Sequence, residues 1–385
     1  MNITVRVGDL GKVITGNTPP RSNPELYGNY IPFIKATDIS ENEKYTYTPE
    51  EYYSEEGFRK YKTSLIPKHS TCVVTIGSIG KKMTMACQDC FINQAMNAII
   101  PNDDYDYEYV YYLLKNNIHK LKNLDSGTAS GRENVSKSAF MGMELSVIKD
   151  KVTQKRIGSI LSAYDDLIEN NQKQIKLLEE AAQRLYKEWF VDLRFPGHEG
   201  VKVVDGVPKG WKKEKLIELA ELKAGGDKPK IFSKIKSNIC KVPIFANGLE
   251  NEGLFGYTDK ADIGQESITI SARGNVGYTC LRRAPYLAIV RLICVIPRKM
   301  HISTYLYFYL KHTNYNSNGS AQQQLTIPMI KNTVVCVPDE NMLSDFDDKA
   351  RCYFDLVDAL KSKISSLREA RDRLLPKLMS GEIEV

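Results

Sequence analysis

The sequence predicts an α+β protein with an internal repeat, in which each of two globular α/β units is followed by one long helix. Three observations support this prediction. The length of 385 residues exceeds what one ordinary core covers. Two stretches carry the same helical pattern of apolar residues, and the segments before them share motifs in the same order. We therefore expect four segments, at 1–150, 151–195, 196–340 and 341–385.

The two long helices are predicted from apolar residues that alternate four and three positions apart. This alternation is typical of the seam of a coiled coil. The first seam consists of Ile157, Leu161, Tyr164, Ile168, Asn171, Ile175, Leu178, Ala182, Leu185 and Trp189. The second, 189 positions later, consists of Phe346, Ala350, Tyr353, Val357, Leu360, Ile364, Leu367, Arg371, Leu374 and Leu378. Two unrelated helices packed on their own domains would explain either seam alone, but ten matched positions favour a repeat.

Each seam contains one polar residue, Asn171 in the first and Arg371 in the second. A buried polar seam residue usually fixes the register of a coiled coil at some cost in stability. If these two positions meet when the helices pair, we expect their side chains to hydrogen-bond. Tyr186, Phe190 and Leu375 are apolar but lie outside the seams. They indicate a second buried face, against either the globular units or another protein.

The globular units share a series of motifs at nearly the same offset. Each has a glycine-containing loop, a proline after an apolar run, an aromatic helical stretch, a polar loop and a final strand. In the first unit these lie at 75–80, Pro101, 109–115, 125–134 and 143–148. In the second they lie at 272–277, Pro297, 305–311, 314–324 and 333–337. Glycines and prolines at 196–210 mark the boundary after the first helix.

The composition indicates a soluble protein of the cytoplasm. Hydrophobic residues make up 42% of the chain and charged residues 26%, as in folded proteins. The sequence contains no apolar run of about 18 residues and no secretory signal. Of the eight cysteines, only Cys87 and Cys90 form a close pair, whereas a structural zinc site normally needs a second pair or spaced histidines. We therefore expect reduced thiols and no metal site.

Motifs for catalysis are incomplete. Residues 77–82 resemble a phosphate-binding loop, but Thr75 replaces its first glycine and Lys82 replaces the Ser or Thr that holds magnesium. Residues 17–20 are similar to an amino-methyltransferase motif, but an extra residue separates Asn17 from the prolines. None of the five histidines is spaced as a metal pair or lies next to an obvious nucleophile. We therefore expect a chain that is not an enzyme and has no catalytic residues.

Positive charge is concentrated in the second unit. Residues 201–340 contain 20 lysines and arginines against 12 acidic residues, whereas residues 1–150 contain 17 against 18. Such an excess is expected of a surface that meets a polyanion, although many enzymes also carry a basic face. Basic side chains in loops contact phosphates, and Arg, Asn and Gln can read base edges in the major groove.

Loop residues of these kinds are the candidate DNA-binding residues, and any one of them could instead be an ordinary solvated side chain. In the first unit they are Arg21, Lys35, Ser78, Lys81, Lys82, Ser130, Arg132 and Asn134. In the second unit they are Lys228, Lys230, Asn247, Arg273, Asn275, Ser320, Gln322 and Gln323. Other residues there that fit phosphate or base contacts are Lys223, Lys234, Lys236, Lys241, Arg282, Arg283, Arg291 and Gln324.

Five stretches, taken in order, resemble the specificity subunits of type I restriction–modification systems. They are 8–20 and 31–39, similar to the first target-recognition domain; 154–195, similar to the central helix; 270–277, similar to a strand and loop of the second domain; and 367–385, similar to the end of the C-terminal helix. Together they cover the length of the chain. The combination is specific to the family, whereas any one stretch alone is a weak signal.

The resemblance implies a non-catalytic DNA reader that serves defence against foreign DNA. Each unit would be a target-recognition domain for one half of a split target, and the helices would pair as an antiparallel coiled coil within a pseudo-twofold repeat. Two methyltransferase subunits, which use S-adenosylmethionine to methylate adenine, would dock on the helices. Restriction subunits, which use ATP and magnesium, would join them, and none of these cofactors would bind this chain. The alternatives are a structural adaptor whose basic surface is incidental, and the specificity half of a fused enzyme, which would need catalytic motifs in the same chain.

Overall fold

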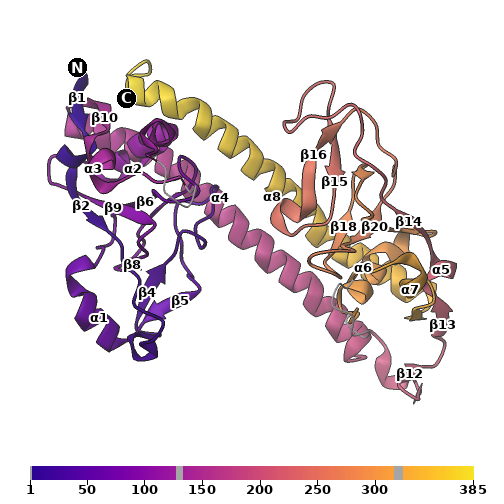
Figure 1. Cartoon of the computed structure of the whole chain (residues 1–385). Coiled ribbons are helices and arrows are strands. Elements are labelled where there is room, and N and C mark those ends of the chain that lie inside the picture. The colour runs from indigo at the N-terminus through magenta and orange to yellow at the C-terminus, as the bar shows by residue number, and fades with distance from the viewer. Residues whose placement is uncertain (1, 127–132, 316–323) are drawn as a thin grey trace. The chain divides into compact units, whose positions relative to one another are not determined.

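The computed structural model describes residues 2–126, 133–315 and 324–385, and they form two compact units (Figure 1). The first unit comprises residues 1–173 and 360–385, and the second comprises residues 174–359. Each unit therefore contains parts of both long helices, α4 (Lys151–Tyr186) and α8 (Glu340–Ser380). A π-helical turn at Lys187–Val191 extends α4.

The first unit contains two four-stranded sheets. One has the order β2-β9-β6-β7, with β2 at Gly11–Thr15, β9 at Met96–Pro101, β6 at Thr71–Val74 and β7 at Met83–Met85. The other has the order β3-β5-β4-β8, with β3 at Tyr27–Gly28, β5 at Glu51–Tyr53, β4 at Ile31–Ile34 and β8 at Phe91–Ile92. A separate antiparallel pair joins β1 (Asn2–Arg6) to β10 (Glu144–Ile148). The shorter helices are α1 (Glu55–Tyr61), α2 (Tyr107–Asn117) and α3 (Lys137–Gly142).

The second unit repeats this topology. The sheet β14-β20-β17-β18 corresponds to the first, with β14 at Ala220–Ala224, β20 at Ile293–Pro297, β17 at Ser267–Ile270 and β18 at Thr279–Arg282. The sheet β16-β15-β19 has β16 at Leu254–Thr258, β15 at Val242–Phe245 and β19 at Leu287–Ala288. In both units the last of these strands pairs in parallel, β8 with β4 and β19 with β15. The remaining strands and helices are β13 (Lys212–Lys215) paired with β21 (Val334–Val337), β11 (Val203–Val204) paired with β12 (Val207–Pro208), α5 (Leu216–Leu219), α6 (Ser303–Lys311) and α7 (Ile327–Ile330).

Both long helices begin at an aspartate that caps the first turn. The Asp150 carboxylate accepts a hydrogen bond from the Thr153 amide at 2.8 Å, and that of Asp339 accepts one from the Met342 amide at 3.0 Å. A capping carboxylate satisfies an amide that the helix leaves unpaired. The two caps lie 189 positions apart, so the repeat that the seams predict extends to the helix starts.

The long helices run antiparallel, which follows from the packing inside each unit. In the first unit, Ile157 and Leu161 of α4 share a core with Leu378 of α8. In the second unit, the late α4 residues Ala182 and Tyr186 share a core with Phe346 and other early residues of α8. Residues at the seam positions are buried or half-buried in both helices. The predicted fold class, with its internal repeat and antiparallel pair of helices, is confirmed.

The two polar seam residues do not hydrogen-bond to each other. Arg371 forms a buried ion pair with Asp165, which lies outside the α4 seam. The side-chain nitrogen of Asn171, Nδ2, is buried and has no hydrogen-bond partner among the described residues. The hydrogen bond that was expected if Asn171 and Arg371 met is therefore absent, because the Asp165 carboxylate, six residues before Asn171, offers the guanidinium a stronger partner.

The second buried face of the helices belongs to the units themselves. Tyr186 and Phe190 lie in the core of the second unit, where both rings pack against Tyr305 of α6. Leu375 lies in the core of the first unit. Of the two explanations that the sequence left open for these residues, packing on the chain's own units is therefore sufficient.

Candidate nucleic-acid interface

Two polar loops that lie far apart in sequence come together in each unit. In the first unit, the amide of Val135 donates to the carbonyl of Thr75 at 2.8 Å, and that of Gly77 donates to Glu133 at 3.0 Å. This pairing places Ser78 and Lys81, both exposed, on a loop beside Asn134. Gly77 and Gly80 have φ values of 90° and 72°, which side chains other than glycine rarely adopt. Ser130 and Arg132 lie outside the described residues.

The second unit contains the matching pair of loops. The amide of Leu325 donates to the carbonyl of Ala272 at 2.9 Å, in the place of the Val135–Thr75 bond. Arg273 and Asn275 are exposed in this loop, and the Arg273 guanidinium donates to the Gln324 side chain at 3.0 Å. The two loops therefore form one polar surface. Ser320, Gln322 and Gln323 lie outside the described residues.

Asn247 ties loops of the second unit to one another. Its side-chain nitrogen donates to the carbonyl of Val290 at 2.7 Å, and its side-chain oxygen accepts from the amide of Ala272 at 2.7 Å. Reading a base with an asparagine requires both of these groups. Asn247 therefore positions the loop that carries Arg273, and one donor and one acceptor of its amide are already used within the unit.

Two candidate cations of the first unit are held by carboxylates. Arg21 lies 2.8 Å from Glu51, and Lys35 forms ion pairs with both Glu50 and Glu51. The hydrogen bond with Glu50 raises the pKa of Lys35. Lys82 is half-buried, and its ammonium lies 3.5 Å from the carbonyl of Ala36. Local compensation of charge weakens the attraction of Arg21 and Lys35 for phosphate.

Part of the basic excess of the second unit is structural. Arg282 is buried and donates to the Thr269 hydroxyl at 3.0 Å, and its guanidinium lies 3.7 Å from the centre of the Phe245 ring. Arg283 forms ion pairs with Glu266, which directly precedes β17, and with Asp355 and Asp358 of α8. Arg282 and Arg283 therefore brace the unit instead of facing a polyanion, which net charge alone cannot reveal.

Lys228 and Lys230, by contrast, are exposed and form no ion pair with the described residues. They lie in the segment 227–241, between β14 and β15. A separate tight turn of the second unit lies at Val290 and Arg291, whose φ values of 54° and 61° are both in the left-handed region. This backbone conformation costs each of these L-residues about 1–2 kcal/mol. Arg291 is exposed there, and its amide donates to the carbonyl of Gly225 at 3.0 Å.

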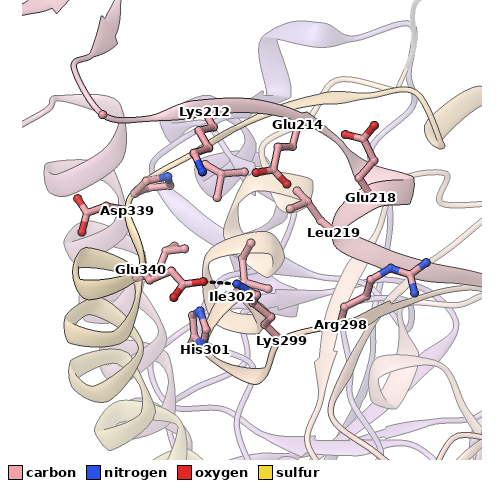
Figure 2. A pocket seen from close by; sticks show the side chains of 14 residues that line it. Lys212, Glu214, Glu218, Leu219, Arg298, Lys299, His301, Ile302, Asp339 and Glu340 are labelled. Carbon is pink, nitrogen blue, oxygen red and sulfur yellow. Dashed lines mark hydrogen bonds and ion pairs between the residues drawn. The ribbon is translucent and has the colours of Figure 1, made fainter.

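Two cavities of the structure are lined by none of the described candidate residues. A cavity of about 360 Å³ in the second unit lies between β13, the loop before α6 and the start of α8 (Figure 2). Its side chains carry both charge signs, and Lys299 and Glu340 form an ion pair at its edge. Another, of about 480 Å³ in the first unit, is lined by Tyr45, Tyr47, Lys68, His69, Cys87, Asp166, Glu169, Asn170 and Lys173. Among the described candidates, Ser78, Lys81, Lys228, Lys230, Arg273 and Asn275 lie on exposed loops, as expected of a surface that meets a duplex.

The described residues offer no site for a metal ion: no three His, Cys, Asp or Glu side chains gather in a suitable group. All eight cysteines are free thiols. Within the same residues, no helix has the length and apolar character needed to span a membrane.

Comparisons with known proteins point to one family. The family described as Type I restriction modification DNA specificity domain matches residues 2–180 and 208–348. The type I restriction enzyme MjaIX specificity subunit of Methanocaldococcus jannaschii is 28% identical over 413 residues, which cover 99% of this chain and 93% of that one. A putative type I specificity subunit of Mycoplasma pneumoniae is 30% identical over 187 residues, 48% of each chain. The crystal structure of an S subunit from M. genitalium matches with a TM-score of 0.60 at 18% identity, over 98% of this chain and 96% of that one.

The chain therefore belongs to the family of DNA specificity subunits of type I restriction–modification systems. Its role in such a system is recognition of the DNA target, and it is not itself an enzyme. The predicted family and the predicted absence of catalytic function are confirmed by these matches.

Proposed function

We propose that each unit reads one half of a split DNA target, and that the paired helices set the length of the unread gap. The observation that carries this proposal is the repeated loop pair, Thr75–Val135 in one unit and Ala272–Leu325 in the other. Both pairs present exposed polar residues on equivalent loops of equivalent sheets. A protein with two equivalent recognition surfaces suits a target with two separated parts.

Base reading is assigned to Ser78, Asn134, Arg273 and Asn275, together with Ser130, Arg132, Ser320, Gln322 and Gln323 from the neighbouring stretches. Arginine and asparagine make paired hydrogen bonds to guanine and adenine, respectively, in the major groove. Lys81, Lys228 and Lys230 are assigned to phosphates, which position the protein without reading sequence.

We propose two methyltransferase subunits, joined by restriction subunits, as the protein partners, in the cytoplasm. S-adenosylmethionine, ATP and magnesium would bind to those partners. Leu177 of α4 and Leu356 of α8, both in the second unit, are exposed apolar side chains on the long helices. Exposed apolar residues on a helix suit a docking surface, since a partner that covers them removes apolar area from water.

Methylome sequencing tests the proposal most directly. Cells that carry the chain and its methyltransferase partner are compared with cells in which only this chain is deleted. We expect adenine methylation at a two-part sequence with a gap of constant length, which disappears on deletion. A continuous target would contradict the division of reading between the units. Methylation that persists unchanged without the chain, together with no mobility shift of duplex DNA, would indicate a protein adaptor.

A further inference from the structure

Residues 227–241 of the second unit form an unusually basic surface segment. They contain five lysines, Lys228, Lys230, Lys234, Lys236 and Lys241, against one acidic residue, Asp227. None of these lysines forms an ion pair with the described part of the chain. The corresponding segment of the first unit, 16–30, has one basic residue, Arg21, and this is paired with Glu51. Of these two corresponding segments, only that of the second unit therefore carries unpaired positive charge.

Aromatic rings hold two of these cations in place. The Lys228 ammonium lies 3.7 Å from the centre of the Phe232 ring, and that of Lys234 lies 4.2 Å from the centre of the Phe255 ring. The two ring centres are 5.4 Å apart. Lys234 also donates a hydrogen bond to the carbonyl of Phe255 at 3.1 Å. Each contact of an exposed cation with a ring contributes about 0.5–1 kcal/mol, so both ammonium groups are partly ordered before any partner binds.

The same segment presents Ile235, 77% exposed, and Ile239, 71% exposed. They are the two most exposed large hydrophobic residues in the described parts of the chain. Fully burying an isoleucine contributes about 1.5–3 kcal/mol, so a partner that covers both would gain substantially in affinity. Such neighbouring exposed side chains indicate a binding role more strongly than a single one does.

The backbone around these isoleucines is anchored. Ser233 exchanges two hydrogen bonds with Tyr257 of β16, at 2.9 and 2.8 Å. Further along, the Cys240 amide donates to the Ser237 hydroxyl at 3.0 Å, and Cys240 is buried. Ile235 and Ile239 therefore project from a braced loop, and little additional ordering is needed on binding.

We propose that segment 227–241 is a DNA-binding arm, in which the lysines contact phosphates and Ile235 and Ile239 wedge between base pairs from the minor groove. Proteins that bind the minor groove often insert apolar side chains between base steps, and they kink the duplex there. The unpaired lysines favour a polyanion as the partner over an apolar protein surface. The proposal rests on the proposed DNA-reading function and adds to it that the second unit deforms its half of the target.

The test uses the assembled complex with its methyltransferase partner and duplexes that carry the target found by methylome sequencing. A 2-aminopurine base is placed in turn at each position of the two half-sites, because its fluorescence increases when the base unstacks. We expect an increase at one step in the half-site of the second unit. The Ile235→Ala/Ile239→Ala variant should lose this increase and bind roughly tenfold more weakly, equivalent to about 1.4 kcal/mol. Val204→Ala, a substitution at another exposed apolar position in the same unit, is the matched control and should change neither the 2-aminopurine fluorescence nor the affinity for DNA.

The lysines are tested separately through the dependence of affinity on salt. Lys230→Gln and Lys236→Gln should each reduce the slope of log affinity against log salt by about 0.9, while the fluorescence increase remains. Lys202→Gln, an exposed lysine outside the segment, is the control. Unchanged slopes in both variants would overturn the assignment of these lysines to phosphates.

Two results would overturn the wedge. In the first, the wild-type complex binds its target but no 2-aminopurine position brightens, so that the reading function stands without deformation. In the second, the double isoleucine variant binds DNA normally but binds the methyltransferase more weakly in the absence of DNA, which would make the isoleucines a protein-docking surface. A wild-type complex with no preference for its target over random duplex would instead refute the proposed function, and the wedge with it.

Discussion

The ion pair between Arg371 and Asp165 provides a quantitative test of how the long helices are joined in the first unit. The two side chains are 5% and 6% exposed, and the Tyr112 hydroxyl donates to the same aspartate at 2.5 Å. Arg371→Met leaves the Asp165 carboxylate buried, with Tyr112 as its remaining hydrogen-bond donor. Removing one partner of a buried ion pair usually costs about 3–5 kcal/mol, because the other charge stays buried without compensation. We expect a loss of this size in the free energy of unfolding.

Urea denaturation of the full chain, followed by far-ultraviolet circular dichroism, measures this loss. Arg373→Met is the matched control, because Arg373 is 78% exposed and pairs with Glu369 on the surface of the same helix. The control should cost less than about 1 kcal/mol. Arg371→Met/Asp165→Asn removes both charges but keeps an acceptor for Tyr112, and should recover most of the stability. If Arg371→Met is no less stable than Arg373→Met, the buried pair does not hold the helices together.

Three further outcomes are expected. Asp150→Ala and Asp339→Ala should each lower the free energy of unfolding by about 1 kcal/mol through loss of a helix cap. Asp348→Ala, at an exposed position within α8, should have little effect in the same denaturation assay. Burial lowers the pKa of Lys115 from its ordinary 10.5 to about 8. Below pH 8 the buried ammonium is charged and opposes folding. The free energy of unfolding should therefore rise as the pH increases from about 8 to about 10.5, where the folded chain has lost the proton that the unfolded chain still binds. Lys115→Met should flatten that rise in urea midpoints measured from pH 7 to 10, and an equally steep profile would show that Lys115 is not its source. Seven residues inserted both after Gln172 and after Ala359 keep the seams in phase and lengthen each helix by about 10 Å. At about 3.4 Å per base pair, methylome sequencing should then show a gap up to three base pairs longer. Insertions of two residues should abolish methylation, and an unchanged gap in the seven-residue variant would contradict the role of the helices as a spacer.

The periodic features of the fold could be predicted from the sequence because they are local. The spacing of four and three residues places one stripe of each helix in a buried environment, and the ten matched positions in each seam are buried or half-buried. The helix caps were missed, although their signal is present. Asp150 and Asp339 each precede a helical apolar pattern, and they are related by the same offset of 189 as the seams.

The roles of individual polar residues could not be predicted, because they depend on neighbours distant in sequence. Asn247 looks like a base reader by residue type, but its partners, Ala272 and Val290, are 25 and 43 residues away. The charge of Arg283 is compensated by Asp355 and Asp358, more than 70 residues further along the chain. Residue type and spacing therefore locate the candidate DNA-binding surface only coarsely. Which cations remain available to DNA follows from tertiary contacts.

The two units differ mainly where the scaffold does not constrain them. The elements that hold each unit together are repeated: the helix caps, the loop pairs and the aromatic helices α2 and α6. The surface charges are not repeated, since Arg21 and Lys35 are paired with carboxylates while the lysines of 227–241 are not. Because a released counterion accompanies each phosphate contact, uneven charge would make the two half-sites of the proposed target depend unequally on salt. Under the proposed function, one duplicated scaffold would combine a unit that depends on hydrogen bonds with a unit that depends on electrostatic attraction.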